Sequence, residues 1–178
     1  NRKLMESRQV AMGKLLSEAE RLENEGKTAM FLSLDGQPAG IIAVADTLKE
    51  TSTQALKELR KMGIKVAILT GDNRRTAKAI AQKLGVERVL AEVFPGDKAS
   101  EVKKLQEEGY KMGMVGDGIN DAPALAQANV GIAIGSGTDI AKETGQVILV
   151  KDDLLDVVAG IQVAKATIRK VKENLFWA

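Results

Sequence analysis

Short apolar runs alternate with amphipathic segments after residue 45, and this alternation restricts the possible folds more than any other feature. The apolar runs predict strands at residues 65–69, 88–91, 111–115, 130–134 and 146–150. Helices are predicted before the first strand, at residues 51–62, and between the strands, at residues 77–84, 97–108 and 122–127 and after Gly137. Strands and helices that alternate in this way form parallel sheets. The runs are apolar throughout, which is typical of strands covered on both faces. We therefore expect an α/β protein with a parallel, Rossmann-like sheet flanked by helices.

Local signals mark the ends of these helices. Thr51-Ser52-Thr53-Gln54 resembles a capping box, in which side chains satisfy the free backbone amides of the first turn. Gly63, Gly85 and Gly109 each follow a helical segment. Glycine adopts the left-handed conformation that commonly ends a helix, so each is expected to do so.

The two ends of the chain do not follow this alternation. Residues 5–25 favour helix with a break at Gly13, and two strands are expected to pair around the turn Asp35-Gly36. These strands are residues 28–34 and 39–44. An apolar stripe at helical spacing predicts one long helix from residue 153 to the end. The expected parts of the chain are residues 1–45, 46–152 and 153–178.

Composition excludes several kinds of chemistry. The chain has no Cys and no His, so disulfides, thiolate or imidazole zinc sites and triads with a His base are excluded. The net charge of +2 gives no argument for a nucleic-acid partner. No apolar run reaches the ~18 residues that a membrane helix needs, so no span is expected within the chain. Chemistry must therefore use carboxylates, hydroxyls, amines, amides and the backbone.

Polar clusters follow three of the predicted strands. They are Thr70-Gly71-Asp72-Asn73, the segment 94–98 that ends at Lys98, and the segment 116–121, which contains Asp117, Asn120 and Asp121. Ligands of parallel α/β sheets bind beyond the carboxyl ends of the strands, so these groups are expected at one edge. A hydroxyl, an ammonium and two carboxylates suit a phosphate handled with Mg²⁺. Backbone amides around Gly71 and Gly118 can come close to such a ligand because glycine has no Cβ.

Each cluster also has a purely structural interpretation. Thr70 is of a type common in turns, Lys98 lies where a solvated charge is usual, and Asp121 is placed to cap the helix that Pro123 begins. The combination of all three clusters, at successive strand ends, favours chemistry.

These residues resemble known motifs. Thr70-Gly71-Asp72-Asn73, Lys98 and the segment 116–125 (GDGINDAPAL) are similar to the second, third and fourth motifs of the haloacid-dehalogenase-like superfamily. More narrowly, they resemble the phosphorylation domain of a P-type ATPase. Asp46 and Lys49 resemble the acid-to-basic hinge of that domain, although many members have Arg where this chain has Lys49. The start at Asn1 resembles a late nucleotide-domain segment of heavy-metal pumps, and the end resembles the start of a membrane helix in the copper-transporting branch.

The resemblance implies a role for each candidate residue. Asp117 would bind Mg²⁺, with support from Asn120 and Asp121. Thr70 and Lys98 would hold the transferred phosphoryl group, and Asp72 would lie near the nucleotide. Asn1 would contact ATP, and Asp46 would belong to the hinge. The implied cofactors are therefore Mg²⁺ and ATP, in the cytoplasmic head of an integral membrane pump that exports a heavy-metal ion, expected to be Cu⁺.

One departure from the family pattern is large. The family phosphorylates an Asp in a DKTGT segment, and this chain has none; its pair Asp97-Lys98 is followed by other residues. We therefore expect a haloacid-dehalogenase-like sheet that lacks the strand carrying the nucleophile, preceded by part of an α+β nucleotide-binding domain. The missing N-terminal part of the same ATPase would be a partner, and the last helix would lead to the membrane. A supplied strand is expected to separate residues 65–69 from residues 111–115.

Other classes remain open from the sequence. A soluble Mg²⁺-dependent phosphatase of the same superfamily would share the second to fourth motifs. A phospho-receiver domain also combines acids, a Thr and a Lys at strand ends, but its acid pair comes early in the chain. Residues 134–138 resemble a dinucleotide-binding loop with one glycine missing, and we interpret them as a tight turn.

Overall fold

The computed structural model describes residues 2–45, 47–117, 120–135 and 145–177. The chain divides into two compact units. Unit 1 comprises Asn1–Leu48 and Val66–Val93, and unit 2 comprises Lys49–Lys65 and Phe94–Ala178. Each unit contains part of the predicted parallel sheet. The predicted division at residues 46 and 153 stays a prediction.

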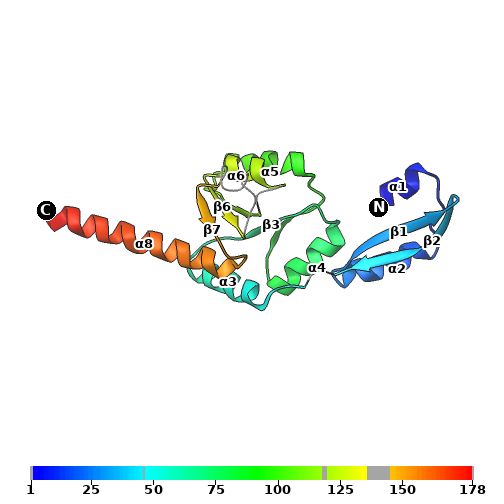
Figure 1. Ribbon diagram of the computed structural model, residues 1–178, viewed down its shortest axis with the longest axis horizontal. Helices are drawn as coiled ribbons and strands as arrows, with labels where there is room; N and C mark the ends of the chain where they lie inside the picture. Colours follow the sequence, from blue (N-terminus) through cyan, green and yellow to red (C-terminus); the bar gives the residue numbers. More distant parts are fainter. Residues whose placement is uncertain (1, 46, 118–119, 136–144, 178) are drawn as a thin grey trace. The chain divides into compact units, whose positions relative to one another are not determined.

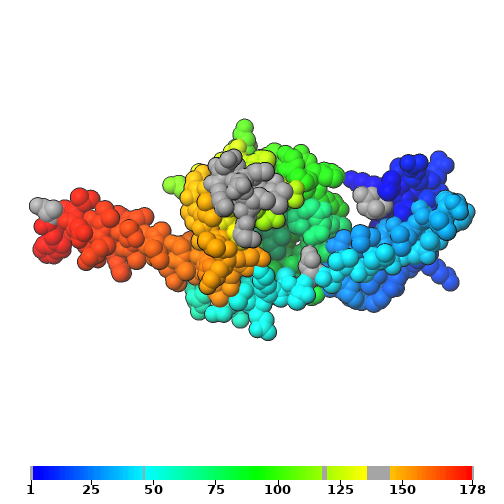
Figure 2. Space-filling view, viewed as in Figure 1, coloured from blue at the N-terminus to red at the C-terminus, as the bar shows by residue number. Residues whose placement is uncertain are grey.

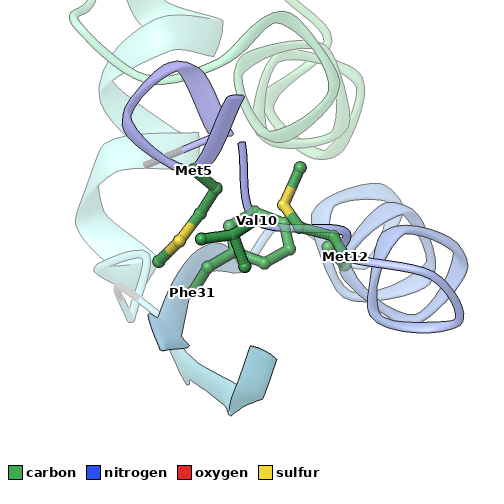
Figure 3. Packing of buried hydrophobic residues seen from close by; sticks show 5 residues of the cluster. Met5, Val10, Met12 and Phe31 are labelled. Atoms are coloured by element: carbon green, nitrogen blue, oxygen red, sulfur yellow. The ribbon is translucent and has the colours of Figure 1, made fainter. Parts of the chain in front are cut away.

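Unit 1 begins with helices α1 (Arg2–Ser7) and α2 (Leu15–Asn24) and the hairpin of β1 (Thr28–Leu34) and β2 (Gln37–Val44). The two strands are antiparallel, as predicted. Both turn residues, Asp35 and Gly36, have positive φ angles of 48° and 76°, which suits the right-handed twist of a tight hairpin. Figure 3 shows the core between helices and hairpin, where Met5, Val10 and Met12 pack with Phe31.

The opposite face of the hairpin is apolar and exposed. Met30 pairs with Ile42 and Leu32 with Gly40, so these side chains share a face with Val44. Met30, Leu32, Ile42 and Val44 are each 44–49% exposed. A half-buried strand usually alternates apolar and polar side chains, and this hairpin instead has apolar side chains on both faces.

The rest of unit 1 is a parallel strand pair and a helix. Strands β3 (Ala67–Leu69) and β4 (Arg88–Leu90) pair in parallel on either side of α4 (Arg74–Leu84) in the chain. Asn73 caps α4, because its side chain accepts hydrogen bonds from the backbone amides of Arg75 and Thr76. Gly85 ends the helix in the left-handed conformation, as predicted.

Buried polar contacts connect helix α4 to α2 and to the turn that follows α2. The carboxylate of Glu23 is only 7% exposed and lies 3.2 Å from Arg75 and 3.6 Å from Arg2. The Thr76 hydroxyl, also buried, donates to the backbone carbonyl of Lys27 at 2.8 Å. These contacts join segments about fifty residues apart and hold the start of β1 in place.

Unit 2 contains the second parallel sheet. Strands β5 (Gly113–Gly116), β6 (Val130–Ile134) and β7 (Val147–Leu149) pair in the order β5-β6-β7. Helix α6 (Ala122–Gln127) packs on β5 and β6, and α5 (Lys98–Glu107), preceded by the 3₁₀ turn η1 (Pro95–Asp97), packs beside α6 (Figure 1). Strand β6 is largely buried, as predicted. Strand β7 is not covered on both faces, since Val147 and Ile148 are exposed and β7 is the last strand of its sheet.

The described residues form two separate parallel sheets. Strand β3 pairs with β4, and β5 pairs with β6, so β3 and β5 do not pair with each other in the part of the chain that the structure describes. The result that would have refuted a separating strand, direct pairing of β3 with β5, is therefore not found among these residues. The supplied strand itself stays a prediction.

The predicted capping box at residues 51–54 is wrong. Helix α3 (Glu50–Lys61) begins earlier, with Lys49 at the N-cap position and no side-chain cap. The ammonium of Lys49 instead donates at 2.6 Å to both the backbone carbonyl and the carboxylate of Asp152. The Thr-Ser-Thr run therefore lies inside the helix, and the side chain of the N-cap residue makes a contact distant in the sequence. Gly63, with φ of 76°, lies just beyond its end, as predicted.

The last helix, α8 (Leu154–Trp177), confirms the prediction of one long helix. The carboxylate of Asp153 accepts from the Leu155 amide at its start. Its first turns pack on α3, with Val157 and Val158 buried. From residue 162 onward every described side chain is exposed. Among the described residues, no helix combines the length and apolar character needed to cross a membrane. The helix predicted after Gly137 falls on residues outside those described.

Candidate functional site

The first group of candidate residues lies in unit 1, directly after β3. The hydroxyl of Thr70 donates to one carboxylate oxygen of Asp72 at 2.9 Å and accepts from the Asp72 amide at 3.1 Å. The loop is held by backbone bonds to the segment after β4, where Val93 donates to Thr70 and Glu92 to Asp72. The structure therefore brings Thr70 and Asp72 together on a fixed loop, while Gly71 between them is exposed.

Thr28 also reaches this group. Its hydroxyl lies 3.4 Å from the other carboxylate oxygen of Asp72. The carboxylate thus lies between a hydroxyl from the β3 loop and one from the hairpin. Sequence reasoning missed Thr28, because a threonine that begins a strand looks like any other β-branched residue.

The second group lies in unit 2, around the end of β5. Lys98 begins α5 and Asp121 immediately precedes α6. The ammonium nitrogen of Lys98 lies 2.5 Å from Oδ1 of Asp121, and each side chain is only 15% exposed. In such shielded surroundings the attraction between opposite charges is several times stronger than in water. The structure therefore brings Lys98 and Asp121 together as a close ion pair.

The ion pair argues against the structural interpretations that the sequence left open for these two residues, a solvated charge for Lys98 and a helix cap for Asp121. Lys98 is not a solvated surface charge. Asp121 occupies the N-cap position of α6 but makes no side-chain cap; only its backbone carbonyl accepts, from Leu125. Its carboxylate is therefore available for Lys98 rather than for the helix end.

Gly116 makes room for the ion pair. A Cβ built on Gly116 would lie 2.6 Å from Oδ2 of Asp121 and 2.8 Å from its Cβ. Those distances are well inside normal contact, so Asp121 could not keep its position beside any larger residue. Sequence reasoning assigned the neighbouring glycines to phosphate approach and missed this role, since only the fold brings the two positions into contact.

The other candidates lie around the same loop or outside the described residues. Asp117 directly follows β5 and is exposed, as is Asn120. Gly118, Asn1 and Asp46 lie outside the described residues.

The acidic side chains present suit Mg²⁺ better than they suit a metal ion that is coordinated by protein side chains alone. No group of three or more acidic side chains gathers anywhere in the described ranges. Mg²⁺ is usually held by one or two carboxylates together with water and substrate phosphates. The exposed carboxylate of Asp117, on a loop beside the Lys98–Asp121 pair, fits that pattern.

The chain is similar to known proteins in both sequence and structure. A family model described as haloacid dehalogenase-like hydrolase matches residues 1–129. The chain is 54% identical over 177 residues to a copper-exporting P-type ATPase of Bacillus subtilis (strain 168), covering 99% of this chain and 22% of that protein. It is 53% identical over 179 residues to a probable copper-exporting P-type ATPase of Archaeoglobus fulgidus, again with 22% of that protein covered.

Solved structures give the same result. A crystal structure of a zinc-transporting PIB-type ATPase matches with a TM-score of 0.74 and 41% identity, over 91% of this chain and 26% of that one. The chain thus spans about a fifth of the length of the curated relatives named above. With its strand-end residues, its parallel sheets and a family model that covers most of its length, the chain belongs to the haloacid dehalogenase-like hydrolases.

Proposed function

We propose that the chain is part of an ATP-driven copper export pump and supplies residues that bind Mg²⁺ and phosphate. In the longer protein, these residues would serve the formation and hydrolysis of an aspartyl phosphate. The names of the two relatives support this proposal over a soluble phosphatase, and the family match argues against a receiver domain.

The Lys98–Asp121 ion pair is the observation that carries the proposal. Catalysis of phosphoryl transfer consists largely of positioning and of charge stabilisation. An ammonium held at a strand end by a carboxylate 2.5 Å away is already positioned before any anion arrives. Asp121 therefore acts as a positioning residue, and Lys98 is the group that meets the phosphoryl oxygens.

The remaining candidates have complementary roles in this proposal. The Thr70 hydroxyl and the Gly71 amide hold the phosphoryl group, while Asp72 lies toward the nucleotide. Asp117 holds Mg²⁺, with Asn120 supporting the loop. When bound, Mg²⁺ neutralises charge on the phosphate oxygens. Asn1 and Asp46 keep the roles that the resemblance gives them, in ATP contact and in the hinge.

The rest of the pump would supply what this chain lacks. The nucleophilic Asp and the strand that carries it would come from the missing N-terminal part of the same ATPase. The ligands of the transported ion, taken as Cu⁺, would come from membrane helices outside this chain. The described part would form a cytoplasmic head, with α8 leading toward the membrane.

The test uses the longer protein that contains this chain. Asp117→Asn is expected to lower the level of phosphoenzyme formed from ATP and Mg²⁺ by about a hundredfold. Asp97→Asn is the matched control, because Asp97 is exposed and makes no side-chain cap at the start of α5. An undiminished phosphoenzyme level in Asp117→Asn, with Asp97→Asn equally active, would exclude the metal role.

A further inference from the structure

The hydroxyl of Thr70 is already engaged with Asp72, and this limits what it can do for a phosphate. It accepts a hydrogen bond from the Asp72 amide at 3.1 Å and donates to Oδ2 of the Asp72 carboxylate at 2.9 Å. The second bond must run in that direction, because an ionised carboxylate only accepts and a hydroxyl has one proton. The oxygens of an ionised phosphoryl group also only accept. Thr70 can therefore donate to a phosphoryl group only after its proton has turned away from Asp72.

Turning the proton away takes a donor from a charged group. Hydrogen bonds to ionised groups are stronger than those between neutral groups, so their loss costs more. The Asp72 side chain is only partly exposed, and water therefore replaces the lost donor incompletely. A second donor beside the same carboxylate would lower the cost of releasing Thr70.

Thr28, the first residue of β1, is placed to be that second donor. Figure 2 shows the hairpin of β1 and β2, in light blue, at the surface on the drawn face. The strand has two hydroxyl side chains, of which Ser33 is exposed and Thr28 is partly buried. The Thr28 hydroxyl lies 3.4 Å from Oδ1 of Asp72, the oxygen that Thr70 does not use. A movement of about 0.6 Å would bring it to the ordinary distance of a hydroxyl donor.

Other hydrogen bonds already hold the start of β1 in place. The Thr76 hydroxyl donates to the backbone carbonyl of Lys27 at 2.8 Å, and the Lys83 ammonium donates to that of Glu25 at 2.9 Å. Both bonds are shorter than the contact between Thr28 and Asp72. The backbone beside Thr28 is thus fixed without that contact, which is not needed as a structural tie.

We propose that Thr28 is a positioning residue that acts through Asp72. Its hydroxyl takes over the Asp72 carboxylate when the Thr70 hydroxyl turns to a phosphoryl oxygen. This inference rests on the proposed function, in which Thr70 holds the transferred phosphoryl group. Thr28 does not contact the phosphate itself, so its effect depends on both Asp72 and Thr70. The position of the hairpin then determines how readily Thr70 becomes a donor to phosphate.

The first test measures phosphoenzyme formation in the longer protein. Thr28→Val removes the hydroxyl and keeps the shape of the side chain, whereas Thr28→Ser keeps the hydroxyl. At saturating ATP, Thr28→Val is expected to lower the single-turnover rate about tenfold, and Thr28→Ser to restore most of it. The KM for ATP should not change, because Thr28 acts on the donor to the phosphoryl group and not on the nucleotide. Ser33→Ala, which removes an exposed hydroxyl from the same strand, is the matched control.

Two further measurements separate this role from nucleotide binding. Phosphoenzyme formation from inorganic phosphate and Mg²⁺, with no nucleotide present, should slow by the same factor in Thr28→Val. In a Thr70→Val background, Thr28→Val should cause no further loss, because the proton that it helps to release is absent.

The 178-residue chain gives a reading that does not depend on activity. Urea unfolding is measured for Thr28→Val in the parent chain and in an Asp72→Ala background. Thr28→Val is expected to raise the unfolding equilibrium constant about threefold more in the parent chain than in that background. The general effects of the substitution cancel in this comparison, so the difference reports the contact between Thr28 and Asp72.

Several results would overturn the proposal. They are an unchanged rate in Thr28→Val, an equal loss in Thr28→Val and Thr28→Ser, a raised KM for ATP with an unchanged rate, and no coupling to Asp72 in urea. The proposed function fails in a different way, when the longer protein forms no phosphoenzyme or when Asp117→Asn leaves its level undiminished. In that case the coupling in the 178-residue chain still decides whether Thr28 positions Asp72.

Discussion

Gly116→Ala tests whether the fit between Gly116 and Asp121 matters as the structure indicates. The added methyl would lie 2.6 Å from Oδ2 and 2.8 Å from Cβ of Asp121. Rotation of the carboxylate relieves the first contact but not the second, so the backbone at the start of α6 must shift. Gly113→Ala is the matched control in the same strand, because its methyl would meet only the Val130 carbonyl, at 3.9 Å.

The expected magnitude combines three effects. Overpacking costs about 1–3 kcal/mol. Separation of the Lys98 and Asp121 charges, each 15% exposed, adds about 1–3 kcal/mol. Replacing a strand glycine by alanine returns about 0.5–1 kcal/mol. We expect Gly116→Ala to lower the free energy of unfolding by about 2–4 kcal/mol. Gly113→Ala should leave it unchanged or raise it by up to about 1 kcal/mol.

Urea unfolding followed by circular dichroism measures both variants. At about 2–4 °C per kcal/mol for a chain of this size, Gly116→Ala should also lower Tm by roughly 4–16 °C. Asp121→Gly supplies the decisive background, since it removes both the carboxylate and the Cβ that the added methyl would meet, so Gly116→Ala should cost far less there. Equal stability of the Gly116→Ala and Gly113→Ala variants would refute the reasoning, as would an undiminished cost of Gly116→Ala in the Asp121→Gly background.

Further expectations concern stability and activity of the chain. Glu23→Ala should lower the free energy of unfolding in urea by about 1–3 kcal/mol, and Glu20→Ala by at most about 1 kcal/mol. The difference is expected because the Glu23 side chain is 7% exposed and that of Glu20 is 42% exposed. Equal costs would contradict the buried cluster. The Arg21 guanidinium lowers the pKa of Glu18. The stability from this pair is therefore present above the unfolded pKa and lost as pH falls below about 4. Arg21→Gln should flatten that acid dependence in urea titrations, and an unchanged slope would argue against the pair. The purified chain should release no phosphate from ATP, because it lacks the nucleophile; release abolished by Asp117→Ala would disprove this. Adding the upstream segment of the longer protein in trans should raise the Tm if it supplies the expected strand, and an unchanged Tm would count against a supplied strand.

The sequence predicted most elements because their signals are local. The hairpin, α6, β6 and α8 lie where apolar spacing and turn residues placed them. The start of α3 did not follow its local signal: the Thr-Ser-Thr run lies inside the helix, and Lys49 at the N-cap position contacts a residue 103 positions away. The candidate residues were also identified by local patterns, but their partners were not. The contacts of Asp121 with Lys98 and with Gly116 form only because α5, β5 and α6 meet in the folded chain.

The contact between Lys49 and Asp152 gives α8 the mechanics of a lever. Lys49 directly precedes α3, and Asp152 lies two residues before α8, so one ion pair of 2.6 Å ties the bases of both helices. A helix of 24 residues is about 36 Å long at 1.5 Å per residue. A rotation of about 5° at its base would move the far end by about 3 Å, roughly the rise of two residues along a helix. A rotation too small to break any contact in the sheet would therefore displace Trp177 by about 3 Å.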